Sequence, residues 1–300
     1  MRQFTNYIFN KIKELNAIQG KRLERNKVFF DDSYYQLAND FFNKYNEFLT
    51  AEGKSLDYAI DCYFQFVADI NIETVEFFRT GKYSSTSFEE VNNRVYNNPE
   101  IMEYYMHALI LTQFLWKHHY KLFSYFINVL PKYIDKIENY LEIGAGHGLY
   151  LSKALEILNS KTKFTAIDIS KTSIEITKKI VNNQKVTFNV RNIFDYHPNE
   201  KFDFITMGEV LEHVEEPLKL LSKLKDLLTD NGTVFITTPT NAPAMDHIYL
   251  FNNTKEIQDL IELSGFRIEE KQLFISEDVT LERAEKNKIC ILFGAFLKKC

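Results

Sequence analysis

The chain has 300 residues, of which 45% are hydrophobic and 26% are charged. This balance is typical of a soluble globular protein that buries a sizeable core. The net charge of −5 gives no electrostatic attraction to nucleic acid or to an anionic membrane, so we expect neither as a partner.

The three cysteines, Cys62, Cys290 and Cys300, are widely separated. They form neither a disulfide framework nor a metal-ligand spacing, which favours a reducing cytoplasm. The most apolar helical stretch, residues 101–130, is interrupted by charged residues and histidines, whereas a membrane span needs about 20 nearly unbroken apolar residues. We therefore expect a soluble cytoplasmic protein.

The first half, residues 1–136, has a helical pattern. It holds 29 of the 44 aromatic residues but only three of the ten glycines. Apolar residues recur at spacings of three and four, for example from Tyr34 to Tyr45 and from Ala59 to Ile70. Asn98 followed by Pro99 is typical of a helix start. The pattern predicts an all-helical N-terminal domain of five or six helices.

The second half, residues 137–300, alternates strand-like runs with amphipathic segments, which predicts an α/β domain with a parallel sheet. A final antiparallel pair, 266–274 with 289–297, is expected at the sheet edge. The predicted strands are 140–143, 164–167, 186–190, 202–207 and 233–237, and the predicted helices are 149–158, 172–181, 217–228 and 254–264.

The first predicted strand runs into the sequence EIGAGHG at positions 142–148. Glycines allow tight turning and close approach of a ligand, and the following helix start offers free N–H groups. Leu149 stands where a dinucleotide-binding fingerprint would need its third glycine, which disfavours a nicotinamide-dependent oxidoreductase. Asp168 ends the second strand, where a carboxylate can accept both ribose hydroxyls of an adenosine.

Together the series EIGAGHG, AIDIS, FDFITMGEVLEHV and GTVFITTP resembles class I S-adenosylmethionine-dependent methyltransferases, in particular the ubiquinone-biosynthesis O-methyltransferase branch, over about residues 139–275. The resemblance implies a Rossmann-like sheet with helices on both faces. It implies S-adenosylmethionine as cofactor and S-adenosylhomocysteine as product. The helical first half matches no family that we can name.

By position, the resemblance implies roles for the residues at the strand ends. Gly144 to Gly146 would face the methionine part of the cofactor, Asp168 the ribose and Ile169 the adenine. Many relatives bind the adenine amino group through an Asp where this chain has Asn192, whose amide oxygen can accept the same bond. The full expected cofactor set is Glu142, Gly144, Ala145, Gly146, Gly148, Asp168, Ile169, Asn192, Ile193 and Met207.

Catalytic candidates follow the fourth and fifth strands. His213 is the nearest general base, with a structural role as the alternative, and Glu209 should lie beside the sulfonium and the acceptor. Asn241, His247 and Tyr249, in a long loop rich in turn formers, are expected to contact the acceptor together with Glu209, and His247 is a third catalytic candidate. We expect no metal, because the acidic residues after the strands form no obvious cation site.

The predicted reaction is in-line methyl transfer to an O, N or C nucleophile of a small molecule. Two alternatives remain open: transfer or cyclisation of the aminocarboxypropyl chain, which releases methylthioadenosine, and a non-catalytic protein that binds the cofactor. For the helical half, the hypotheses are a lid over the acceptor pocket or a homodimerisation surface.

Overall fold

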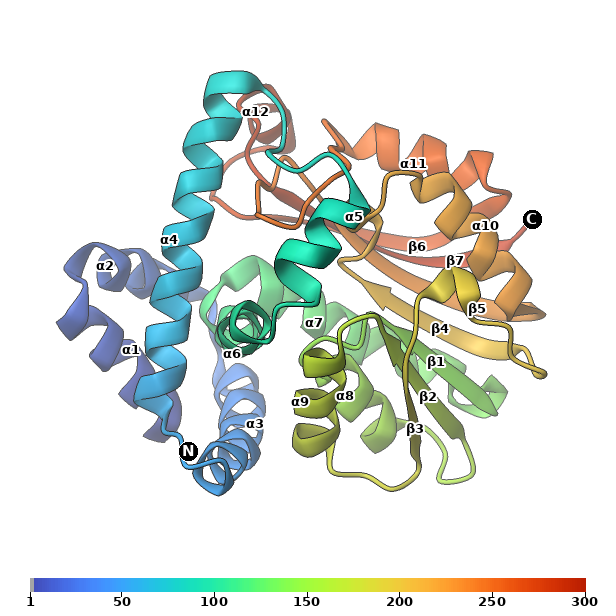
Figure 1. Ribbon diagram of the computed structural model, residues 1–300, viewed down its shortest axis with the longest axis horizontal. Coiled ribbons are helices and arrows are strands. Elements are labelled where there is room, and N and C mark those ends of the chain that lie inside the picture. Colours follow the sequence, from blue (N-terminus) through green and yellow to red (C-terminus); the bar gives the residue numbers. More distant parts are fainter. Residues whose placement is uncertain (1–2) are drawn as a thin grey trace.

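The computed structural model describes residues 3–300. Figure 1 shows a group of helices beside a twisted sheet that is covered by further helices. The helical part comprises α1 (Gln3–Leu15), α2 (Ala17–Asn26), α3 (Asp32–Ala51), α4 (Leu56–Thr80), α5 (Phe88–Val91), α6 (Pro99–Leu115) and α7 (Lys117–Val129). These are seven α-helices where the sequence predicted five or six.

The apolar stretch 101–130 forms two helices, because Trp116 adopts an extended backbone (φ −99°, ψ 118°) between α6 and α7. Asn98 caps α6 as predicted, since its side chain accepts from the backbone N–H of Glu100 and Pro99 occupies the first turn. No helix within residues 3–300 is long and apolar enough to cross a membrane.

The sheet has seven strands in the order β3-β2-β1-β4-β5-β7-β6. Strands β1 to β5 are parallel, and β7 runs antiparallel between β5 and β6, which confirms the predicted α/β class and the antiparallel pair. The strands are β1 (Asn139–Ile143), β2 (Lys163–Asp168), β3 (Val186–Val190), β4 (Phe202–Gly208), β5 (Leu228–Thr240), β6 (Phe266–Ile275) and β7 (Ile291–Lys299); the helices among them are α8 (Leu149–Ile157), α9 (Lys171–Val181), α10 (Pro217–Leu227), α11 (Thr254–Leu263) and α12 (Leu281–Lys286).

Strand order reverses between β1 and β4, since β2 and β3 lie on one side of β1 while β4 and β5 lie on the other. Ile143, the last residue of β1, is opposite Met207 in β4, so both strands end at the same edge of the sheet. Open α/β sheets bind ligands in the crevice beyond the carboxyl ends of strands at such a reversal. The topology therefore places the site beyond the ends of β1 and β4.

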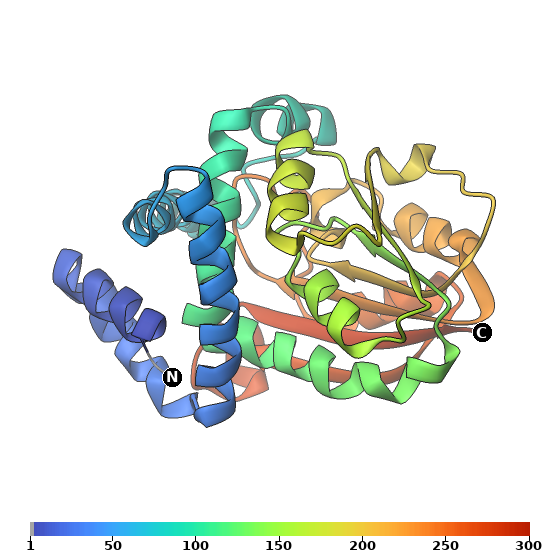
Figure 2. The same ribbon diagram turned by 90° about the horizontal axis from the view of Figure 1, so that it is seen from below.

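Helix α7 packs against the sheet although it belongs to the predicted helical half. The rings of Tyr125 and Phe126 lie 5.5 Å from Phe296 and 5.0 Å from Phe235 between centroids. One buried hydrophobic cluster extends from α1 to the strands. Figure 2 shows the remaining N-terminal helices to one side of the sheet and its layers. The division at residue 136 remains a prediction, and the two sides of it share a core.

Candidate functional site

The loop after β1 leaves room for backbone but not for side chains. Gly144 and Gly148 have φ of +66° and +71°, which disfavour any residue with a Cβ. A Cβ on Gly144 would lie 2.7 Å from Val210 Cγ2, and one on Gly148 would lie 2.8 Å from Thr177 Cγ2. Gly144 thus faces the turn after β4, whereas Gly148 packs on α9.

A cavity of about 800 Å³ begins at this loop and continues past the ends of β1, β2 and β4. Most of the predicted cofactor residues line it: Glu142, Gly144, Ala145, Gly146, Asp168, Ile169, Asn192 and Ile193. Gly148 and Met207 lie outside the lining. Met207 is fully buried in the core, because side chains alternate along β4 and its neighbours Thr206 and Gly208 face the cavity instead.

Asp168 braces the glycine loop from the end of β2. Its carboxylate accepts from Gly146 N at 3.3 Å, from Ser170 N at 2.8 Å and from Ser173 Oγ at 2.9 Å. Burial raises the pKa of Asp168, against the lowering effect of these donors. The carboxylate is therefore held at the cavity wall, where it keeps acceptor capacity for hydroxyl groups of a ligand.

Glu142 and Asn192 have local partners as well. Glu142 Oε2 accepts from the hydroxyl of Tyr140 at 2.8 Å, and burial raises the pKa of Glu142 to about 8. The Glu142 carboxyl is therefore held in place beside the glycine loop. Asn192 Oδ1 accepts from Phe194 N at 3.0 Å, which leaves one lone pair of that oxygen for a ligand. His147, in the same glycine loop, accepts from Leu149 N at 3.2 Å at the start of α8.

Glu209 follows β4 in a backbone conformation that is unusual for a residue with a side chain, with φ of +54°. Its N–H donates to Thr237 O at 2.9 Å, and its Oε1 accepts from Thr237 Oγ1 at 2.7 Å. Burial raises the pKa of Glu209 to about 7. The end of β5 thus fixes a carboxyl group in the cavity wall.

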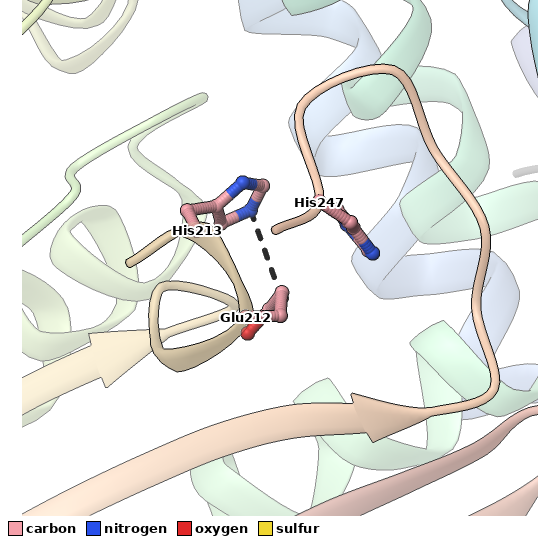
Figure 3. Close-up of side chains that lie close together, drawn as sticks. All are labelled: Glu212, His213 and His247. Carbon is pink, nitrogen blue, oxygen red and sulfur yellow. Dashed lines mark ion pairs between the residues drawn. The ribbon is translucent and has the colours of Figure 1, made fainter. Parts of the chain in front are cut away.

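Glu212, His213 and His247 come together beyond these strand ends. Figure 3 shows Glu212 and His213 on the turn after β4 and His247 on the loop that follows β5. One ligand atom from each lies within 4.8 Å of the others. Among residues 3–300, Glu212 Oε1 and His247 Nδ1 are buried without a hydrogen-bond partner.

Buried polar atoms are normally paired, so two unpaired acceptors at one point indicate a missing partner. Two histidines and one carboxylate are a donor set that suits Zn²⁺ or Fe²⁺. This grouping differs from the expectation that the acidic residues form no cation site. No short sequence pattern indicates that the loop carrying His247 folds back onto Glu212.

The acceptor candidates divide into two groups. Asn241 and His247 line the cavity, as do Glu209 and His213. Tyr249 does not line it: the ring packs 4.8 Å from that of Phe251, on the opposite face of the sheet in the second hydrophobic core. We call the group of Glu212, His213 and His247 the polar centre. Beyond it, the cavity extends between α4 and α6 and is lined there by apolar residues that include Phe66, Phe77, Met102, Met106 and Trp116.

The profile of the methyltransferase domain family matches residues 115–279, more than half of the chain. The chain belongs to this family. The match agrees with the ordered strand-end motifs and with the glycine loop, to which the resemblance assigns the binding of S-adenosylmethionine. The family range begins in α6, so most of the helical part lies outside it.

Similar proteins support this assignment. The ubiquinone biosynthesis O-methyltransferase of Xanthomonas campestris pv. campestris is 32% identical over 108 residues, which cover 35% of this chain and 44% of that protein. The malonyl-[acyl-carrier protein] O-methyltransferase 1 of Ilyobacter polytropus is 23% identical over 178 residues, 56% of this chain and 62% of that protein. The chain thus spans about half of the length of the relatives that it matches.

Among solved structures, mitomycin 7-O-methyltransferase has a similar fold, with a TM-score of 0.53 at 11% identity. The alignment covers 77% of this chain and 68% of that chain. At this identity the similarity concerns the fold alone. The substrate of the present protein must therefore be inferred from its own cavity.

Proposed function

We propose that the protein transfers a methyl group from S-adenosylmethionine to an oxygen nucleophile of a small molecule. The observation that carries the proposal is that His213 and His247 line the same cavity as the glycine loop and Asp168, with Glu212 buried directly beside the two histidines. The relatives named above are O-methyltransferases, which supports oxygen rather than nitrogen or carbon as the attacking atom.

The chain's own residues divide the work between two ends of the cavity. The glycine loop, Asp168 and Asn192 hold the nucleoside and the methionine part, while the acceptor lies against Glu209, Asn241 and His213. Because methyl transfer is an in-line displacement, alignment of the acceptor oxygen with the methyl carbon is the main contribution. Where no cation is held, His213 is the candidate that removes the acceptor proton.

Glu212, His213 and His247 are the residues that would hold a divalent cation. Such a cation would supply Lewis-acid chemistry that lowers the pKa of an acceptor hydroxyl. The three residues suit such a cation, since Glu212 and His247 each have a buried acceptor atom without a hydrogen-bond partner among residues 3–300.

The apolar extension of the cavity supports an acceptor with a hydrophobic body. Aromatic and methionine side chains from α4 and α6 form this part of the wall, and the polar groups gather at the strand ends. A hydroxylated aromatic compound has this division between a polar edge and an apolar face. We propose further that α4 and α6 close over the acceptor and that the reaction takes place in the cytoplasm, which cell fractionation would test.

A metal-depletion experiment tests the proposal. The protein is incubated with S-adenosylmethionine and a panel of catechols, and the nucleoside product is identified by mass. S-adenosylhomocysteine with a methylated catechol is expected, whereas methylthioadenosine would overturn methyl transfer. Dialysis against EDTA should lower turnover about 100-fold, or about 3 kcal/mol, and Zn²⁺ or Fe²⁺ should restore it.

Variants of the candidate ligands complete this test. His247→Ala and Glu212→Gln should abolish the restoration by metal, while affinity for S-adenosylhomocysteine should stay within twofold. His197→Ala, which removes an exposed histidine outside the cavity lining, is the matched control and should behave as the parent protein. Full turnover after EDTA treatment would remove the cation from the proposal and leave His213 as the base.

A further inference from the structure

The segment 83–105, which runs from the end of α4 to the middle of α6, is hydrogen-bonded to the loop that carries His247. Tyr83 accepts from Ala242 N at 3.0 Å, and Ser85 donates to Met245 O at 2.7 Å. Arg94 also donates to Met245 O. Residues 83–105 precede the range of the family match, yet they fix the course of residues 242–246.

Two tyrosines of this segment reach the polar centre. Tyr105 donates to Asp246 Oδ1 at 2.7 Å. The Tyr96 hydroxyl lies 2.9 Å from His213 Nδ1 and donates to Asp246 Oδ2 at 3.4 Å. Asp246 is 2% exposed, so its carboxylate depends on these protein donors.

The bonds at Nδ1 define the state of the His213 ring. Nδ1 lies 2.9 Å from the backbone oxygen of Asp246, which can only accept, so Nδ1 carries the hydrogen. The Tyr96 oxygen shares this hydrogen while its own O–H points to the Asp246 carboxylate. Nε2 is the ring nitrogen left for another partner, and it lies 3.7 Å from Glu212 Oε1.

We propose that Tyr96 and Tyr105 are positioning residues that hold His213 and Asp246 so that Nε2 of His213 faces Glu212 and His247. The inference rests on the proposed function, since it assigns these tyrosines to the orientation of the candidate ligands. Hydrogen bonds to the second nitrogen of a ligating histidine fix its tautomer and ring orientation. The helical part therefore completes the polar centre.

The neighbouring Tyr104 provides a matched comparison, because its hydroxyl bonds a different carboxylate from that of Tyr105. Tyr104 and Tyr105 are consecutive on α6 and are almost equally buried, at 8% and 6% exposure. The Tyr104 hydroxyl donates to Asp69 on α4, at 2.7 Å, and away from the polar centre. Tyr104→Phe thus removes a tyrosine hydroxyl from the same helix without touching Asp246 or His213.

The test uses Co²⁺ as a probe with the full chain. Visible absorption gives the Co²⁺ dissociation constant, which should rise about 10-fold or more in Tyr96→Phe and in Tyr105→Phe. It should stay within twofold in Tyr104→Phe. Calorimetry with S-adenosylhomocysteine should give equal affinities for all three variants, which separates positioning from general loss of the fold.

A second measurement does not depend on metal. In ¹⁵N spectra of the histidine side chains, with His213 assigned through His213→Gln, the parent protein should show Nδ1–H and an unprotonated Nε2. Tyr96→Phe and Tyr105→Phe should shift these signals, and Tyr104→Phe should not. Parent protein that fails to bind Co²⁺ contradicts the cation in the proposed function, and the ¹⁵N spectra then decide the inference alone. Equal behaviour of the three variants in these spectra would overturn it.

Discussion

Replacement of Gly144 by alanine probes the glycine loop where it approaches the turn after β4. An L residue at φ near +66° costs about 1–2 kcal/mol. The added Cβ would lie 2.7 Å from Val210 Cγ2, and overpacking of this kind costs about 1–3 kcal/mol. We therefore expect Gly144→Ala to lower the free energy of unfolding by about 2–5 kcal/mol.

Gly53 provides the control for the backbone contribution alone. It has φ of +70°, and a Cβ there would meet no described atom within 4 Å, so Gly53→Ala should cost only about 1–2 kcal/mol. Urea unfolding measures both costs, and calorimetry with S-adenosylhomocysteine should show weaker binding for Gly144→Ala only. Addition of Val210→Ala should recover part of the loss. If Gly144→Ala lowers the free energy of unfolding no more than Gly53→Ala does, the contact with Val210 contributes nothing to the cost and the reasoning is refuted.

Two further predictions concern the cofactor and pH. Asp168→Asn should raise the dissociation constant of S-adenosylhomocysteine about 10- to 100-fold, because charge-assisted hydrogen bonds contribute about 1.5–3 kcal/mol. Calorimetry measures this constant, and Asp195→Asn, which changes an exposed carboxylate, is the control. An unchanged constant would reject Asp168 as a residue that binds the cofactor. Burial lowers the pKa of His107 to about 4 although Glu103 lies 3.5 Å away. The folded state therefore disfavours the charged ring, so stability present above pH 6.5 is lost as pH falls toward 4, by about 2 kcal/mol at pH 5. His107→Gln should flatten this dependence in urea unfolding at pH 8 and pH 5, and an equally steep loss would contradict the assignment.

Sequence reasoning works well where the signal is local. The parallel strands, the glycine loop and the carboxylate after β2 all follow from short patterns, and the structure has them where predicted. The cofactor roles of these residues remain predictions. Met207 lies outside the cavity because successive side chains of a strand point to opposite faces of the sheet. A prediction that is wrong by one position along β4 therefore names a residue on the face away from the cavity.

What depends on distant segments could not be predicted in this way. Glu212 and His247 meet because the loop after β5 is held by Ser85 and Tyr105, which belong to the helical half that resembles no family we can name. Tyr249 is two residues beyond His247, but its side chain turns into the core. The break at Trp116 was likewise hidden, because tryptophan is compatible with a continuous helix and tertiary packing decides its backbone.

The packing of α7 on the sheet limits how the two parts can be separated in experiments. A protein that lacks residues 1–130 would lose Tyr125 and Phe126 and would present Phe235 and Phe296 to water. Its inactivity would report unfolding rather than the absence of a lid. The two parts should melt in one cooperative transition, and any ligand that tightens the sheet should also slow the opening of the helices packed on it.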